Sequence, residues 1–106
     1  MTSGSTALTF ERDGSLLVAR AVREAEMHLS FEEDDTFTEA RVTLHLRSLD
    51  LTGYGRARRN PHDPLAPKVG EELAAARATA DLAQQLLDLA TYQIEKQEGR
   101  PVHLEL

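Results

Sequence analysis

The chain has 106 residues and 41% hydrophobic content, which is enough for one globular domain and too apolar for wholesale disorder. It contains no cysteine, which excludes disulfides, thiolate nucleophiles and cysteine-type zinc sites and favours a cytoplasmic location. The formal net charge of -6 argues against a chain built as a whole to bind nucleic acid.

The N-terminal residues 1–21 are predicted to form a flexible arm. Leu8-Thr9-Phe10 and Leu16-Leu17-Val18 flank a turn-forming Asp13-Gly14, so a short hairpin or docking segment is expected there. The early apolar run 16–19 is too short for a signal peptide, and no stretch approaches the ~20 apolar residues of a membrane span.

Residues 24–32 and 39–47 alternate between apolar and polar side chains, which is typical of half-buried strands. The polar residues 33–36 between them (Glu, Asp, Asp and Thr) form a predicted four-residue turn. That turn would place His28 opposite Arg41 and Glu24 opposite His45, with both apolar sets on one face.

Residues 51–59 predict a third strand whose inward positions include Gly53, Gly55 and Ala57. Glycines weaken a strand unless another backbone must approach closely. After a proline-rich connection at 60–67, a helix is predicted over 69–96 and is closed by Gly99. Its stripe of apolar residues would pack on the glycines; the stripe comprises Leu73, Ala76, Ala80, Ala83, Leu87, Ala90 and Ile94.

These elements predict an α+β fold in which a three-stranded antiparallel sheet is packed by one long C-terminal helix. The domain would span residues 22–98, followed by a C-terminal tail at 99–106.

A second helix stripe contains Leu82, Leu86 and Leu89, together with Ala75 and Ala78. Three strands cover only ~14 Å at ~4.8 Å spacing, which is too narrow for both stripes. We therefore expect Leu82, Leu86 and Leu89 to form a homodimer interface. The alternative is that Leu16, Leu17 and Val18 fold back over them.

The chain shows no constellation typical of an enzyme. Its histidines (His28, His45, His62 and His103) lack metal-ligand spacing, so no metal site or cofactor is expected. Gly53-Tyr54-Gly55 lacks the helix and Lys-Ser/Thr of a phosphate-binding loop, and no serine or threonine has a positioned His and acid. We expect neither catalysis nor a small-molecule substrate.

The outer sheet face is the most informative surface. Residues 40–62 carry five arginines and one acid, whereas residues 22–39 carry seven acids and one arginine. Arg41, Arg56, Arg58 and Tyr54 should converge on the outer face, where they are candidate contacts for RNA phosphates and bases. The alternative is an ordinary polar face whose cations offset neighbouring carboxylates.

A composite motif resembles a family of small actinobacterial proteins of unknown function. It consists of Gly53-x-Gly55-x-Ala57-Arg58-x-Asn60-Pro61-x-Asp63 followed by Gly70-x-Glu72-Leu73-x-x-Ala76-Arg77-Ala78-x-x-Asp81-Leu82, and the similarity covers about residues 22–96. The resemblance implies a fold related to double-stranded RNA-binding domains, homodimers, and a likeness to ribosome hibernation factors. Some members are associated with hypoxia and dormancy.

The resemblance implies a stress-linked role at the ribosome. Together with the converging arginines, it leads us to expect a non-enzymatic homodimer that binds ribosomes or structured RNA. The chain departs from double-stranded RNA binders at the start of its helix, where Lys68 is followed by Glu71 and Glu72 instead of a lysine cluster. A protein–protein interaction module is the alternative function.

Overall fold

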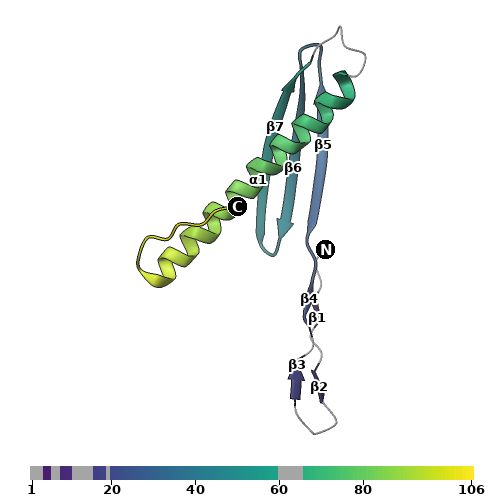
Figure 1. Cartoon of the computed structure of the whole chain (residues 1–106). Helices are drawn as coiled ribbons and strands as arrows, with labels where there is room; N and C mark the ends of the chain where they lie inside the picture. The colour runs from purple at the N-terminus through teal and green to yellow at the C-terminus, as the bar shows by residue number, and fades with distance from the viewer. Residues whose placement is uncertain (1–3, 6–7, 11–15, 19, 60–65) are drawn as a thin grey trace.

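The computed structural model describes residues 4–5, 8–10, 16–18, 20–59 and 66–106. Its main body is a three-stranded antiparallel sheet, in the order β5-β6-β7, with one long helix across one face (Figure 1). This confirms the predicted fold class. The elements are β1 (Gly4–Ser5), β2 (Leu8–Phe10), β3 (Leu16–Val18), β4 (Val22–Arg23), β5 (Glu26–Glu33), β6 (Phe37–Leu46), β7 (Leu49–Arg58) and α1 (Ala66–Glu98).

The N-terminal segment contributes two small strand pairs. β2 pairs antiparallel with β3, as predicted for a hairpin, and β1 pairs with β4. The expected turn at Asp13-Gly14 lies outside the described residues.

The β5–β6 register differs by two residues from the prediction. His28 lies opposite Thr43, and His45 lies opposite Glu26. The reason is a tighter turn, in which Asp34 Oδ1 accepts hydrogen bonds from the N–H groups of Thr36 and Phe37, each at 2.7 Å. An even shift preserves the assignment of side chains to faces.

The same turn is tied to the end of β7. The Arg59 N–H donates to the Thr36 carbonyl at 2.6 Å, and its guanidinium donates to the Asp34 carbonyl at 3.0 Å. The hydrogen bonds from Phe37 and Thr36 hold the pKa of the Asp34 carboxyl below its usual value.

The helix meets the sheet through backbone contact at two glycines, as predicted. A Cβ at Gly55 would overlap the Ala74 carbonyl oxygen and the Ala78 nitrogen, and one at Gly53 would lie 2.7 Å from the Leu82 nitrogen. Small residues on both elements therefore allow the two backbones to touch.

The assignment of the two helix stripes was wrong. The residues that face the sheet are Ala74, Ala78 and Leu82, which are almost fully buried. Leu73, Ala76 and Ala80 are instead exposed, while the rest of that stripe is half-buried. Ala74, Ala78 and Leu82, which are spaced four residues apart, face the sheet because this orientation sets the helix backbone directly over the two glycines of β7.

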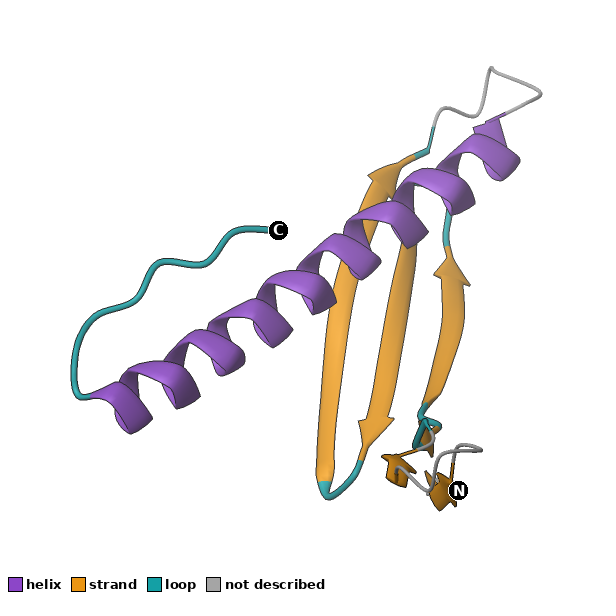
Figure 2. Cartoon of the chain, turned by 60° about the horizontal axis from the view of Figure 1, so that its bottom comes forward, coloured by secondary structure: helices purple, strands orange, loops and turns teal. Residues whose placement is uncertain are grey.

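Helix α1 is longer than predicted at both ends. It begins at Ala66, so Pro67 lies in the first turn, where a missing N–H costs no hydrogen bond. Its last residue is Glu98, and it is terminated as expected by Gly99, which has a φ of 71° and donates its N–H to the Glu95 carbonyl. The tail at 100–106 then turns back, and the Val102 N–H donates to the Glu95 carboxylate at 2.8 Å (Figure 2).

Helix α1 covers the sheet unevenly. It packs on β7 and β6 and then runs beyond the sheet at its C-terminal half (Figures 1 and 2). The core consequently consists of residues from those three elements: Ala40, Val42, Leu44, Ala57, Ala74, Ala78 and Leu82. All eight residues of β5 are exposed.

Candidate nucleic-acid interface

The predicted RNA-binding residues do converge on the sheet face opposite the helix. Arg41 lies directly opposite Tyr54 in the β6–β7 register, and Glu39 lies opposite Arg56. Arg58 follows two positions later on the same face of β7, ~6.8 Å further along the strand. Arg41, Tyr54, Arg56 and Arg58 are all exposed.

Two of the arginines are held over aromatic rings. The Arg41 guanidinium carbon lies 5.5 Å from the centroid of the Tyr54 ring, and that of Arg56 lies 3.5 Å from the centroid of the Phe37 ring. Such contacts restrict the guanidinium orientation while leaving its donors available. Phe37 is the aromatic residue of this face that the sequence reasoning missed, because it had been placed next to the turn and outside the strand.

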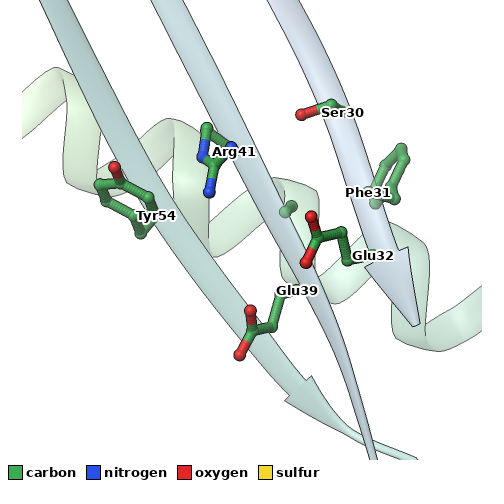
Figure 3. A pocket seen from close by; sticks show the side chains of 7 residues that line it. Ser30, Phe31, Glu32, Glu39, Arg41 and Tyr54 are labelled. Atoms are coloured by element: carbon green, nitrogen blue, oxygen red, sulfur yellow. The ribbon is translucent and has the colours of Figure 1, made fainter. Parts of the chain in front are cut away.

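The face is also more acidic than the sequence predicted. Arg56 Nε lies 3.6 Å from Glu39 Oε1, an exposed ion pair of the kind that contributes ~0–1 kcal/mol. Glu39 stands directly opposite Glu32 on β5, and Figure 3 shows both carboxylates beside Arg41 and Tyr54. Among the strand residues of this face, Glu26, Glu32, Glu39 and Asp50 outnumber the three arginines.

A shallow hollow lies among these side chains, with a volume of about 30 Å³. It is lined by Ser30, Phe31, Glu32, Glu39, Ala40, Arg41 and Tyr54 (Figure 3). It has room for no more than a few water molecules, so this part of the surface suits an extended ligand lying on it.

The histidines of the outer face pair with carboxylates. His45 Nδ1 lies 2.6 Å from Asp50 Oδ1, and His28 Nε2 lies 3.5 Å from Glu26 Oε2. The two imidazole rings meet edge-on with centroids 5.6 Å apart. Within the described ranges, no group of three or more His, Asp or Glu residues is arranged to hold a metal ion. His62 lies outside those ranges.

The predicted dimer residues are placed against the chain's own sheet. Leu82 is 1% exposed and belongs to the core, and Leu86 is partly buried against it. Leu89 is half-buried beside the β6–β7 turn, where it lines a hollow of about 400 Å³ together with Leu46 and Leu49. The chain's own sheet therefore buries Leu82, and the prediction that Leu82 lies in a dimer interface is wrong, whereas for Leu86 and Leu89 that role stays a prediction.

The uncovered apolar surface lies instead on β5. Met27, Leu29 and Phe31 are 56%, 51% and 39% exposed, although they share a face with the buried residues of β6. The sequence reasoning placed these side chains under the helix because it assumed that one helix would cover all three strands.

Three helix side chains bond to the outer edge of β7. Asp81 Oδ2 accepts a hydrogen bond from the Tyr54 N–H at 2.9 Å, Arg77 Nη1 donates to the Arg56 carbonyl at 2.7 Å, and Gln85 Nε2 donates to the Thr52 carbonyl at 2.7 Å. We call these side chains the edge clip. The sequence suggested only an Arg77–Asp81 ion pair. A spacing of four residues shows that two side chains share a helix face, but it does not show which strand lies next to that face.

No helix within the described part of the chain is long and apolar enough to cross a membrane.

Comparison with known proteins places the chain among mycobacterial relatives. It is 38% identical over 76 residues to the uncharacterised protein Mb1767 of Mycobacterium bovis, covering 72% of this chain and 81% of that protein. It is 36% identical over 80 residues to the uncharacterised protein Rv2632c of Mycobacterium tuberculosis, covering 76% and 86% respectively.

The crystal structure of Rv2632c matches with a TM-score of 0.66 and 36% identity, and the match covers 74% of this chain and 93% of that chain. The model of the Rv2632c-like family matches residues 17–103. The chain belongs to the Rv2632c-like family.

Proposed function

We propose that the chain is a non-enzymatic, homodimeric, cytoplasmic protein that binds the ribosome or structured RNA during stress such as hypoxia or dormancy. The observation that supports RNA binding is the outer sheet face, where Arg41, Arg56, Arg58 and Tyr54 come together on two adjacent strands. The resemblance to proteins associated with hypoxia and dormancy supports the stress role.

The arrangement of the cationic groups suits contact with phosphates. Arg41 and Arg56 are oriented by Tyr54 and Phe37, so fewer rotamers need to be ordered when a phosphate binds. Tyr54 is 60% exposed and offers a ring on which an unpaired base can stack.

The acidic neighbours define which kind of RNA contact is expected. Glu32 and Glu39 lower the positive potential of the face, so binding depends on a few specific arginine–phosphate contacts and not on a broad cationic field. Binding must also release Arg56 from Glu39, which costs little because this exposed ion pair contributes only ~0–1 kcal/mol.

The proposal is tested by co-sedimentation with ribosomes and by fluorescence anisotropy with a structured RNA, each at ~50 and ~200 mM salt. Wild-type binding should weaken steeply with salt. Arg56→Glu/Arg58→Glu should bind at least about tenfold more weakly at low salt and lower the salt slope by about two.

The matched control is Lys96→Glu/Arg100→Glu, which makes the same change in charge at exposed positions near the end of the helix. It should leave binding within about threefold of the wild type, in contrast to the loss expected on the sheet face. Equal losses of RNA affinity in both variants would mean that net charge, and not the sheet face, accounts for binding. An absence of wild-type binding would refute the RNA proposal.

A protein–protein interaction module is the second candidate. It is favoured by the exposed Met27, Leu29 and Phe31, since apolar side chains grouped beside a sheet edge mark a contact surface. Capture of one defined protein that survives nuclease treatment would support it, whereas loss of the captured material on nuclease treatment would favour RNA.

A further inference from the structure

Strand β5 leaves one edge of the sheet open. It pairs with β6 on one side, and no described strand pairs with its other side. The Asp34 N–H bonds to the Phe37 carbonyl, which sets the alternation of the ladder. The even-numbered residues of β5 therefore face β6, and Met27, Leu29, Phe31 and Glu33 turn their backbone N–H and C=O groups to the open edge.

The same odd-numbered residues carry the uncovered apolar side chains. Met27, Leu29 and Phe31 lie opposite Leu44, Val42 and Ala40 and so extend the core beyond the area that α1 covers. The open edge thus combines unpaired backbone groups with an apolar face, which are the two features that a pairing strand satisfies together.

The two edges of the sheet are treated differently. The edge clip bonds one outward backbone group on each of three β7 residues, namely the Thr52 carbonyl, the Tyr54 N–H and the Arg56 carbonyl. β5 has no such cover from α1, and its sequence contains no lysine, arginine or proline that would discourage pairing.

We propose that β5 pairs antiparallel with β5 of a second copy, about a two-fold axis at Ser30. The two sheets then form one six-stranded sheet with both helices on the same side. This inference rests on the proposed homodimer and names the surface that forms it.

Charge and the length of β5 favour this register over two neighbouring registers that also keep the apolar residues of both copies on one face. An axis at Leu29 would place Glu26 opposite Glu32 of the other copy, twice. An axis at His28 would leave Phe31 opposite residue 25, outside the strand. An axis at Ser30 places each His28 opposite Glu32 of the other copy and each Leu29 opposite Phe31, and it leaves Met27 opposite Glu33 at the two ends of the pairing.

A cysteine scan tests the register, because the natural chain has no cysteine. Ser30 would face itself across a non-hydrogen-bonded pair, with Cα atoms ~4.5 Å apart, which fits a disulfide. Under mild oxidation Ser30→Cys should form a disulfide-linked dimer at least about tenfold faster than His28→Cys, whose two copies would lie ~13 Å apart. Faster linkage of His28→Cys would overturn the proposed register, and so would a Ser30→Cys variant that stays monomeric.

A second experiment tests the surface itself by sedimentation of the full-length chain. Leu29→Glu should raise the dimer dissociation constant at least about 100-fold while leaving the CD spectrum unchanged, because Leu29 is already half exposed. The control Leu73→Glu places the same charge on an exposed apolar position of the helix and should leave the dissociation constant within about threefold of the wild type.

The outcomes separate this inference from the proposed function. A wild type that is monomeric at ~100 μM would refute both the homodimer and the β5 interface. A dimer that survives Leu29→Glu would refute the β5 interface alone. Slow amide exchange of Met27, Leu29 and Phe31 in a monomer would assign the edge to the chain's own N-terminal segment and also overturn the inference.

Discussion

The carboxylate of Asp81 accepts a hydrogen bond from the backbone N–H of Tyr54 at 2.9 Å. A helix side chain thereby occupies the position from which the backbone of another strand would otherwise form a hydrogen bond with β7. The same carboxylate receives Gln85 Nε2 at 3.2 Å, so two members of the edge clip hold each other in place. The contact also fixes the strand that carries Tyr54 and Arg56 on the outer face.

Asparagine and alanine at position 81 should separate the edge clip from a simple ion pair. Asp81→Asn keeps a carbonyl oxygen for the Tyr54 N–H, so the free energy of unfolding should stay close to that of the wild type. Asp81→Ala removes the acceptor and should lower it by about 0.5–1.5 kcal/mol in urea denaturation. If an ion pair with Arg77 mattered more, the asparagine variant would lose as much as the alanine variant.

Gly55→Ala should be among the most damaging small substitutions in the chain. Its Cβ would meet helix backbone, which cannot rotate away as a side chain can. We expect a loss of at least about 3 kcal/mol, or no folded protein. Gly70→Ala is the control, because its Cβ would meet the Thr38 hydroxyl at 3.2 Å in a helix where alanine is preferred by about 1 kcal/mol. Equal losses in thermal unfolding would show that the helix does not approach β7 so closely.

The β5–β6 turn should contribute to acid sensitivity through Asp34. Its pKa is lowered in the folded state by the hydrogen bonds from Phe37 and Thr36, so its contribution to stability is present above the unfolded-state pKa of about 3.8. That contribution is lost as pH falls through the folded-state pKa. Asp34→Asn retains an acceptor for both N–H groups without titrating, so its melting temperature should change less than that of the wild type between pH 5 and 3. An identical pH profile would contradict this role.

Tyr54 should contribute to RNA binding through its ring. Tyr54→Ala removes the ring on which an unpaired base can stack and the support beneath Arg41, and it should weaken binding to the structured RNA by about 1–3 kcal/mol at fixed salt. Tyr54→Phe keeps the ring and should bind within about threefold of the wild type. A comparable loss in Tyr54→Phe, measured by anisotropy, would mean that the hydroxyl is the important group and not the ring.

The sequence was sufficient to predict the strands, the single long helix and the contact at Gly53 and Gly55. Each of these follows from a local pattern: alternation, helical spacing, or a residue with no side chain. The choice of helix face did not follow, because both stripes are apolar. It was decided by the fit of one backbone on another at Ala74 and Ala78, which hydrophobic spacing does not encode.

The candidate site was predicted less completely. The alternation of side chains along each strand was enough to place Arg41, Arg56 and Tyr54 on one face. The register error at the turn did not change this placement, because the shift was an even number of residues. The opposition of Glu32 to Glu39 depends on the register itself, which the Asp34 hydrogen bonds set. The edge clip and the uncovered side of β5 depend on the angle of the helix across the sheet, and no stretch of sequence specifies that angle by itself.

The difference between the sheet's two margins has a consequence for assembly size. A sheet that is open on both sides can add molecules at each end and grow into a fibre. Here Arg77, Asp81 and Gln85 of α1 occupy the β7 margin, so β5 is the one open joining strand of the described three-stranded sheet. If two β5 strands pair as proposed, neither described three-stranded sheet keeps an open strand, and growth through this sheet would stop at a pair.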